Sequence, residues 1–491
     1  MTSFVEAARR EKIEALRRLG VAPYAYRFDR TGTIAEAATT WREGDETVHR
    51  LAGRLVALRP HGKTTFGHLA DASGKMQVYF KVDDVGAETY ELVKLLDLGD
   101  LIGAEGPLFR TKTGELTLRA ARVTLLAKTL RPLPLGKEDE QGVRHGELSD
   151  PEVRYRQRYA DLAVHPEVRE IFRLRARVVS GIRRFLDVRG YLEVETPVLQ
   201  PLYGGATARP FTTHYDALDT TVYLRIADEL YLKRCIIGGL EKVYEIGHDF
   251  RNEGLSRFHN PEFTMAEWYQ AYADYGDTLE LTEAMLAELI RALFDATTLE
   301  RRGATLSFAR PFARKDFYAL VRDTAGVDLT TASEDNVRTA LRHRGVEDVD
   351  ALSGAKLVDE VFKTYAEPTL IQPTFVLDYP IALSPLAKPK RGDPGRAERW
   401  ELFVQGTELA NSFSELNDPE DQRRRFEQQA RLRAAGDQEA QRLDEDFLRA
   451  LEYGMPPTGG VGLGVDRLMM VLADQPSIRD VILYPMLRPE T

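Results

Sequence analysis

The segment Phe250–Tyr275, FRNEGLSRFHNPEFTMAEWYQAYADY, constrains the fold more than any other part of this chain. Its second half has the period of an extended strand, which would place Phe263, Met265, Glu267 and Tyr269 on one face. A buried carboxylate on such an apolar face is costly unless a cation pairs with it. Glu267 therefore indicates either an edge strand open to water or a pocket that binds a cationic group.

The loop before this strand carries side chains that suit a phosphate ligand. Arg251, Glu253 and His259 all fall within FRNEGLSRFHNPEF. An arginine offers a planar fork of donors that matches phosphate oxygens. Loop and strand together predict a pocket for a ligand that has both phosphate and ammonium groups.

Composition excludes several classes of protein. The chain has 491 residues, of which 43% are hydrophobic and 29% charged, as in ordinary globular proteins. No apolar run approaches the roughly 20 residues of a membrane span, and the N-terminus lacks the apolar core of a signal peptide. Cys235 is the only cysteine, which excludes an intrachain disulfide and a thiolate zinc cluster. We expect a cytoplasmic protein with no membrane partner.

The N-terminal third predicts a nucleic-acid-binding module. Residues 1–47 form a helical extension, with a helix expected at Ser3–Leu19 and Ser3 as its cap. Residues 48–131 contain about five short strands and one helix, the count of an OB-fold barrel. They carry thirteen lysines and arginines against nine acids, whereas the whole chain has a net charge of −10. Phe66, Gln77 and Glu115 are candidates to stack on and read unpaired bases, although each could be ordinary barrel surface.

The remainder predicts an α+β domain. Residues 132–160 are polar and are interpreted as a linker, and residues 161–491 as one domain with a helical insertion around 300–370. A helix at Glu167–Val188 is followed by sequential strands with short loops, which favours a largely antiparallel sheet flanked by helices.

Two later segments add candidate ligand-binding groups. Glu401–Leu416 has the pattern of a hairpin that turns at Gln405-Gly406, with Glu401 and Glu408 on its two arms. Thr458–Ala473, TGGVGLGVDRLMMVLA, predicts a glycine-rich strand that runs into a helix, with Asp466 as its N-cap. The spacing does not fit the G-x-G-x-x-G dinucleotide fingerprint. Small residues would instead let a ligand approach the backbone, with Arg467 facing a phosphate or a base.

Three of these segments together resemble the signature motifs of class II aminoacyl-tRNA synthetases: the helix and strand that end at Pro197, the FRNEG…HNPEF segment, and GVGLGVDRLMM. The order of a basic OB-like module and then a catalytic domain is similar to the aspartyl, asparaginyl and lysyl subgroup. The stretches YRQRYADL, LRIADELYLKR, GTELANSFSELNDPEDQ and SIRDVILYPMLRP resemble the bacterial-type lysyl enzymes in particular.

This resemblance implies that the chain attaches L-lysine to tRNA(Lys) through a lysyl-adenylate made from ATP, as a homodimer that uses Mg²⁺. The implied catalytic residues are Arg251 and Arg467. Implied ATP-binding residues are Arg251, Glu253, His259, Asn260, Phe263, Glu408 and Arg467. Implied lysine-binding residues are Gly205, Glu229, Arg251, Glu267, Tyr269, Asn411, Phe413 and Glu415. Glu401 and Glu408 would bind the metal, and Phe66, Gln77 and Glu115 the anticodon.

Other functions compete with this one. An aspartyl or asparaginyl enzyme is disfavoured because Glu415 and Tyr269 stand where an aspartate ligand would need a cation. A relative that lysylates a translation factor would lack the OB module. A degenerate synthetase that only binds RNA would have lost Arg251, Glu408 or Arg467. The Rossmann type of lysine-charging enzyme would show HIGH and KMSKS motifs, which are absent from the sequence.

The chain also departs from the family pattern. Phe258 occupies a position before His259 that is usually basic, and Arg257 comes one residue earlier. His248 and Asp249 stand where the family tends to have an Arg-Asn pair, and Ser412 replaces a common glycine. The Phe258 departure puts one outer-phosphate contact in doubt.

Overall fold

A computed structural model describes residues 4–138, 144–434 and 442–490. The chain divides into two compact units, Met1–Pro166 and Glu167–Thr491. Each unit has its own hydrophobic cluster of buried side chains. No helix of the described residues has the length and apolar character needed to cross a membrane.

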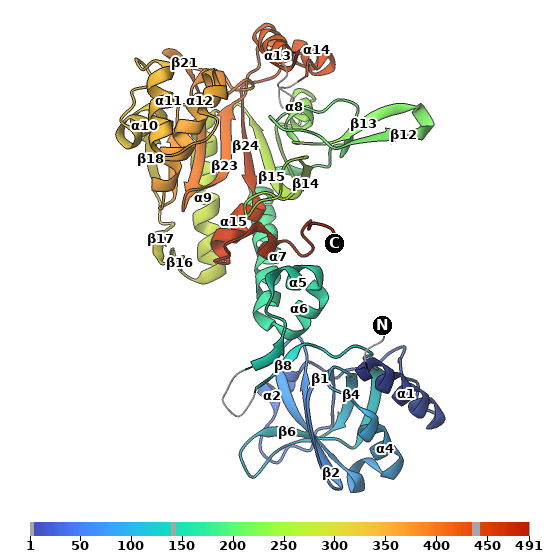
Figure 1. Ribbon diagram of the computed structural model, residues 1–491. Helices are drawn as coiled ribbons and strands as arrows, with labels where there is room; N and C mark the ends of the chain where they lie inside the picture. The colour runs from blue at the N-terminus through green and yellow to red at the C-terminus, as the bar shows by residue number, and fades with distance from the viewer. Residues whose placement is uncertain (1–3, 139–143, 435–441, 491) are drawn as a thin grey trace. The chain divides into compact units, whose positions relative to one another are not determined.

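The first unit is built on a seven-stranded sheet with the order β5-β6-β3-β2-β1-β4-β7, and the OB-fold prediction is confirmed (Figure 1). The expected helix is observed as α1, Phe4–Arg18, while its predicted cap Ser3 lies outside the described residues. The strands are β1 (His49–His61), β2 (Thr64–Ala70), β3 (Lys75–Lys81), β4 (Leu101–Gly106), β5 (Leu108–Arg110), β6 (Leu116–Arg119) and β7 (Arg122–Ala127), and the other helices are α2 (Ile34–Thr40), α3 (Val82–Val85) and α4 (Ala87–Leu95).

The polar segment after this sheet contains regular structure. β8 (Leu135–Glu138) pairs antiparallel with β9 (Arg144–Glu147). Helix α5 (Pro151–Arg156) then begins where the Asp150 side chain accepts a hydrogen bond from the Val153 amide, and α6 (Arg158–Val164) follows. An aspartate N-cap followed by proline at the first helical position is a strong start signal.

The second unit is organised by an eight-stranded sheet with the order β10-β14-β15-β24-β23-β22-β19-β18. All neighbours pair antiparallel except the outermost pairs, β10 with β14 and β18 with β19, which are parallel. Its strands are β10 (Leu192–Glu193), β14 (Lys242–Phe250), β15 (Glu262–Ala271), β18 (Ala313–Asp316), β19 (Thr374–Leu377), β22 (Arg399–Val404), β23 (Thr407–Ser414) and β24 (Thr458–Gly464).

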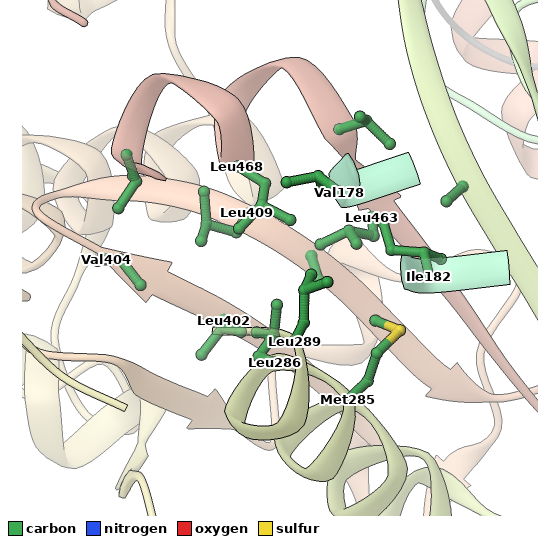
Figure 2. Close-up of a cluster of buried hydrophobic side chains, with 14 of the residues drawn as sticks. Val178, Ile182, Met285, Leu286, Leu289, Leu402, Val404, Leu409, Leu463 and Leu468 are labelled. Atoms are coloured by element: carbon green, nitrogen blue, oxygen red, sulfur yellow. The ribbon is translucent and has the colours of Figure 1, made fainter. Parts of the chain in front are cut away.

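Helices cover one face of this sheet and form the main core. Figure 2 shows apolar side chains from α7 (Pro166–Asp187), α9 (Tyr275–Phe294) and α15 (Val465–Leu472) that meet residues of the central strands. Ala266 and Trp268 of β15 belong to this core, so the even-numbered residues of that strand face the helices. Its odd-numbered residues therefore face the opposite side of the sheet.

Smaller elements surround the sheet. The insertion between β18 and β19 has a separate apolar cluster and consists of α10 (Phe317–Ala325), α11 (Glu334–His343) and α12 (Gly354–Val361), followed by a π-helical turn, Phe362–Ala366. The remaining elements are β11 (Leu199–Gln200), β12 (Thr212–Tyr215), β13 (Thr220–Leu224), α8 (Glu229–Ile237), β16 (Thr298–Arg301), β17 (Ala304–Ser307), β20 (Pro389–Lys390), β21 (Asp393–Ala397), α13 (Pro419–Ala434), α14 (Glu445–Glu452) and α16 (Ile478–Val481).

Two local predictions have different outcomes. β22 and β23 form the expected hairpin, and Gln405 and Gly406 at its turn both have positive φ, at 52° and 67°. The prediction that Asp466 caps a helix is wrong, because Gly464 holds the N-cap position of α15. The Asp466 carboxylate instead accepts a hydrogen bond from the Thr264 amide at 2.7 Å and pairs with Arg175 at 2.5 Å. Asp466 thus ties α15 to the middle of the sheet.

Candidate active site

A cavity of about 370 Å³ opens on the face of the sheet opposite the core helices. It is lined by β15, β23, β24, the loop 251–261 and the start of α8. Every residue that the sequence proposes for ATP or lysine lines this one cavity: Gly205, Glu229, Arg251, Glu253, His259, Asn260, Phe263, Glu267, Tyr269, Glu408, Asn411, Phe413, Glu415 and Arg467. Glu401, proposed for the metal, is not among the lining residues.

One end of the cavity is rich in cationic groups. The Arg251 guanidinium lies 5.0 Å from the centroid of the Phe263 ring, and its Nε donates to the Ile226 carbonyl. His259 Nε2 lies 3.5 Å from Arg467 Nη2, and His259 Nδ1 is held by the Ser256 hydroxyl at 2.8 Å. Burial and then the Arg467 charge lower the pKa of His259. This end can bind an anion.

Asn260, which the sequence proposes for the adenine region, also serves the local backbone. Its Nδ2 donates to the Glu262 carbonyl at 2.6 Å, and its Oδ1 accepts from the Met486 amide at 3.1 Å. The side chain thereby links the loop to the C-terminal segment while it lines the cavity.

The two proposed metal-binding carboxylates are both held by arginines. Glu408 pairs with Arg467 at 3.0 Å, and Glu401 pairs with Arg399 and accepts from the Tyr379 hydroxyl at 2.7 Å. Burial raises the pKa of Glu401, Arg399 opposes that rise, and the nearby Glu408 adds to it. The resulting pKa is about 7. Burial, together with Glu401 and Glu408, raises the pKa of Glu367 to about 8. The raised pKa values of Glu401 and Glu367 indicate a region of negative potential around these two residues. The pKa of Glu408 is instead lowered, because Arg467 and Arg399 outweigh its burial.

The other end of the cavity is acidic. The Tyr269 hydroxyl donates to Glu267 Oε2 at 3.0 Å, and both side chains are at most 6% exposed. Burial, then Asp249 and Glu229, raise the pKa of Glu267 to about 8. Glu415, which is 1% exposed, enters from the end of β23. The odd-numbered face of β15 is therefore a binding wall and not an open edge, since β14 and β24 pair with it on both sides.

The glycines of β24 make room for these acids. A Cβ on Gly460 would lie 2.1 Å from Glu415 Oε1 and 2.3 Å from Tyr269 Cε1. The sequence suggested that small residues there let a ligand approach the backbone. At Gly460 the space is filled by the protein's own Glu415 and Tyr269, so the glycine shapes the acidic wall itself.

Sequence reasoning missed Lys233, which does not line the cavity but contacts two of its acidic residues. Its Nζ lies 2.5 Å from Glu229 Oε1 and 2.5 Å from Glu415 Oε2, and its side chain is fully buried. The spacing of Glu229 and Lys233, four residues apart at the start of α8, is the signal that could have found it. Burial lowers its pKa, but the two glutamates outweigh that effect and raise it, so Lys233 stays charged.

A second missed group is a pair of buried aspartates behind Glu267. Asp228 and Asp249 are both 0% exposed, share a hydrogen bond, and contact Arg225 at 2.8 and 3.4 Å. Burial, Asp249 and Glu267 raise the pKa of Asp228 to about 10, whereas the pKa of Asp249 rises only to about 6, because Arg251 and Arg225 oppose its burial. The coupled pair therefore retains a proton at neutral pH.

Arg399 is a third residue that the sequence did not reveal. Its Nε donates to Asn411 Oδ1 at 3.1 Å, while other nitrogens of the same guanidinium bind Glu401 and the Leu383 carbonyl. One arginine thus connects a proposed metal carboxylate to a proposed lysine-binding amide.

The departures from the family pattern have local explanations. Phe258 lines the cavity and packs against the main core, and the Arg257 guanidinium lies 4.5 Å from the centroid of its ring. His248 pairs with Glu262 at 2.7 Å on the surface. The Ser412 hydroxyl hydrogen bonds to Thr278 at 2.8 Å on the core side of β23, which a glycine could not do.

The OB-fold brings the three residues proposed to bind anticodon bases, Phe66, Gln77 and Glu115, onto one face of its sheet. The ring centroids of Phe66 and Tyr79 are 4.7 Å apart, and those of Tyr79 and Phe109 are 6.2 Å apart. Beside them, Gln77 Nε2 donates to Glu115 Oε2 at 2.7 Å, and His68 Nε2 lies 2.9 Å from Glu115 Oε1. A row of half-buried aromatic rings next to amide and carboxylate groups is suited to unstacked bases.

Comparison with known proteins matches two regions of the chain to family models. Residues 150–488 match the family model of class II tRNA synthetases (D, K and N), and residues 49–126 match that of an OB-fold nucleic-acid-binding domain. The chain belongs to the class II tRNA synthetases of this D, K and N group.

Similar proteins narrow the comparison within that group. The chain is 51% identical over 487 residues to a protein of Moorella thermoacetica named lysine–tRNA ligase, with 99% of this chain and 98% of that protein covered. It is 48% identical over 482 residues to the lysine–tRNA ligase of Carboxydothermus hydrogenoformans, with 98% and 97% covered. It is 49% identical over 484 residues to that of Pelotomaculum thermopropionicum, with 98% and 94% covered.

Proposed function

We propose that this chain attaches L-lysine to tRNA(Lys), with ATP as the energy source. The observation that carries the proposal is the charge pattern of the single cavity. Its cationic end, with Arg251 and Arg467, suits the phosphates of ATP and a carboxylate, and its acidic end, with Glu267 and Glu415, suits an ammonium group. The full-length similarity to lysine–tRNA ligases supports the same assignment.

The acidic end selects the amino acid. The lysine ε-ammonium would bind between Glu415, Glu267 and the Tyr269 hydroxyl, while Glu229 and the backbone at Gly205 take the α-ammonium. Aspartate or asparagine would leave these buried carboxylates without a cation, which is strongly penalised. Phe413 and Asn411 would complete the walls around the side chain and the carboxylate of lysine.

The first chemical step needs positioning more than acid–base catalysis. An oxygen of the lysine carboxylate attacks the α-phosphorus of ATP, the bond from that phosphorus to the bridging oxygen of the β-phosphate breaks, and pyrophosphate leaves with the electron pair. Arg251 would contact the carboxylate and the α-phosphate, and thereby stabilise the charge that develops on the equatorial oxygens. Phe263 and Arg467 would hold the adenine between them, with His259 on the outer phosphates and Glu253 and Asn260 near the base.

The second step transfers the lysyl group to tRNA. A hydroxyl of the terminal adenosine attacks the lysyl carbonyl carbon, and AMP leaves with its phosphate. Phe66, Gln77 and Glu115 of the OB-fold would bind the anticodon and thereby select the tRNA.

Mg²⁺ fits the neighbouring carboxylates Glu401 and Glu408. The described residues contain no group of three or more candidate His, Cys, Asp or Glu metal ligands. Magnesium in phosphate-transfer sites is usually held by one or two carboxylates together with substrate phosphates, and Glu401 and Glu408 would supply those. When bound, the ion would neutralise charge on the phosphates. The raised pKa values of Glu401 and Glu367 are expected to fall once a cation is present.

We further propose that the chain works as a homodimer in the cytoplasm. Apolar side chains at the end of α7 and at the short strands β10 and β11 are exposed, among them Val188 at 72%, Leu192 at 51% and Leu199 at 55%. Exposed apolar side chains beside the edge strand β10 support an interface there. The molar mass by sedimentation, compared between the wild type and Leu192→Asp, tests this surface.

Amino-acid-dependent exchange of pyrophosphate into ATP tests the function. We expect lysine, and neither aspartate nor asparagine, to stimulate exchange, and we expect tRNA(Lys) to accept the label in a charging assay. Exchange stimulated by aspartate or asparagine instead of lysine would refute the amino-acid assignment. Exchange without tRNA charging, but with lysylation of a protein acceptor, would favour the translation-factor alternative, and no exchange with any amino acid would favour an RNA-binding role.

A further inference from the structure

A fully buried cation, Lys233, lies against the glutamates at the acidic end of the cavity, and its position carries the inference. Lys233 Nζ contacts Glu229 through Oε1 and Glu415 through Oε2, both at 2.5 Å. These are the two glutamates proposed for opposite ends of the lysine substrate. The ammonium also lies 5.5 Å from the centroid of the Phe413 ring, which closes one side of it.

The second oxygen of each glutamate points elsewhere. Glu229 Oε2 lies 3.8 Å from where a Cβ of Gly205 would be, on the side proposed for the α-ammonium. Glu415 Oε1 lies on the side of Gly460 and Tyr269, proposed for the ε-ammonium, whereas Oε2 is the oxygen that pairs with Lys233. Neither oxygen accepts a hydrogen bond from a described residue. Each carboxylate therefore offers one oxygen to Lys233 and keeps the other for a ligand.

We propose that Lys233 is a positioning residue for amino-acid selection, which bridges Glu229 and Glu415 and turns the remaining oxygen of each toward one ammonium group of the substrate. This inference rests on the proposed function. It explains why a protein that binds the two ammonium groups of lysine keeps a buried cation against the same glutamates.

Charge counting supports this role. Glu229, Glu267 and Glu415 carry three negative charges when ionised, and Lys233 cancels one of them. Two negative charges remain, which the α- and ε-ammonium groups of lysine would cancel. An amino acid with only one ammonium group would leave a buried charge unpaired. Without Lys233 the count would no longer match lysine.

The ionisation of the pocket gives the proposal a measurable consequence. Burial raises the pKa of Glu229 and Glu415, and the Lys233 charge opposes that rise in both. The groups that face them are Glu267 and Tyr269 from β15 and Arg399 from β22. Glu267 raises the pKa of Glu415, and Arg399 opposes the rise in the pKa of Glu229. Tyr269 stays neutral, because burial and the glutamates raise its pKa further above its ordinary value. If Lys233 loses its charge, the pKa values of Glu229 and Glu415 will rise. These glutamates will then stay protonated to higher pH, and substrate lysine must displace the protons to bind.

The test measures lysine-dependent pyrophosphate exchange between about pH 6 and 9 in Lys233→Met and Lys233→Arg. For Lys233→Met we expect the KM for lysine at neutral pH to rise at least about tenfold, with the KM for ATP within about twofold of the wild type. We expect the lysine KM to fall as pH rises and then to level off. In Lys233→Met the pH at which it levels off should be higher than in the wild type by about one unit or more. Lys233→Arg, which keeps the charge, should retain the wild-type pH profile.

The chain offers a matched control in its other unit. Lys128 is also fully buried between two carboxylates, Asp97 at 2.5 Å and Asp100 at 2.7 Å. Lys128→Met removes the same kind of bridge but should leave the lysine KM and its pH profile unchanged. If Lys233→Met does not fold, Lys233→Gln, which can hydrogen bond to both glutamates without a charge, takes its place in the same comparison.

The outcomes separate this inference from the proposed function. A wild type without lysine-dependent exchange would refute the function. A wild type with such exchange would refute the role of Lys233 if the neutral variants kept a lysine KM within about twofold of normal. The role is equally refuted if the lysine and ATP KM values rise together, or if the neutral and arginine variants share one pH profile.

Discussion

The buried aspartate pair predicts an unusual pH dependence of stability, which Asp228→Asn should remove. In the folded protein the pKa of Asp228 is raised to about 10, above its ordinary value of 3.8. A raised folded pKa contributes stability that is fully present below about pH 3.8 and is lost as pH rises toward 10. Between pH 5 and 7 Asp228 holds a proton in the folded state that it has lost in the unfolded chain, so this residue alone lowers the free energy of unfolding by about 1.4 kcal/mol for each pH unit. The contribution of Asp228 over this window is about 2.7 kcal/mol.

Asparagine can keep both contacts of the protonated acid. Its oxygen can accept from Arg225, which now lies 2.8 Å from Asp228 Oδ1, and its amide can donate to Asp249. The variant should therefore gain about 2.7 kcal/mol relative to the wild type as pH rises from 5 to 7. Acids with raised pKa values that lie apart from the pair, such as Glu367, affect both proteins and cancel in the comparison.

Urea unfolding followed by tryptophan fluorescence measures this difference. The chain has three tryptophans, and Trp41 lies in the first unit, so a Trp41→Phe background leaves Trp268 and Trp400 to report on the second unit alone. Parallel pH profiles for the two proteins would refute the reasoning, because they would mean that Asp228 is ionised when folded.

Asp421→Asn in the same background is a control of opposite sign. Burial opposes it, but hydrogen bonds from Arg425 keep the pKa of Asp421 below its ordinary value. Its contribution is present above the unfolded pKa and is lost as pH falls through the folded one. The variant should therefore be less stable than the wild type at pH 7 and approach it in acid.

Three further predictions concern the two binding surfaces. Gly460→Ala should raise the lysine KM at least about tenfold with little change in the ATP KM, because the new Cβ would collide with Glu415 and Tyr269; equal effects on both KM values in pyrophosphate exchange would contradict this. Glu415→Gln should weaken lysine by about 3 kcal/mol or more and ATP hardly at all, and unchanged lysine-dependent exchange would remove Glu415 from the pocket assignment. Phe66→Ala should weaken tRNA binding by about 1–3 kcal/mol in a filter-binding assay while exchange without tRNA stays normal, and a loss of exchange would instead indicate a folding defect.

The sequence allowed prediction of features that depend on local periodicity. The alternation in β15 was sufficient to place Glu267 and Tyr269 on one face, and Gln405-Gly406 was sufficient to locate the tight turn between β22 and β23. Both depend on neighbours within a few residues, and the chain expresses them directly as side-chain period and turn residues.

Contacts between distant segments could not be predicted in the same way. Lys233 and Asp228 looked like ordinary residues at the start of a helix, because their partners are distant in the sequence: Glu415 directly follows β23, and Asp249 lies in β14. Asp466 is in a position that suits a cap, but a strand amide and Arg175 compete for the same carboxylate. In each case tertiary pairing, and not local propensity, determines what the acid does.

The pairing of β15 on both sides has a consequence for how such a pocket can change over evolution. Its register is fixed by Glu245 of β14 on one side and Gly462 of β24 on the other, both opposite Glu267. The loss or gain of a single residue within β15 would exchange its two faces, and Trp268 would enter the cavity while Glu267 entered the apolar core. A lineage with this fold can therefore alter its amino-acid preference by replacing side chains in place, whereas changes of length must be confined to loops such as 251–261 and to the tips of hairpins.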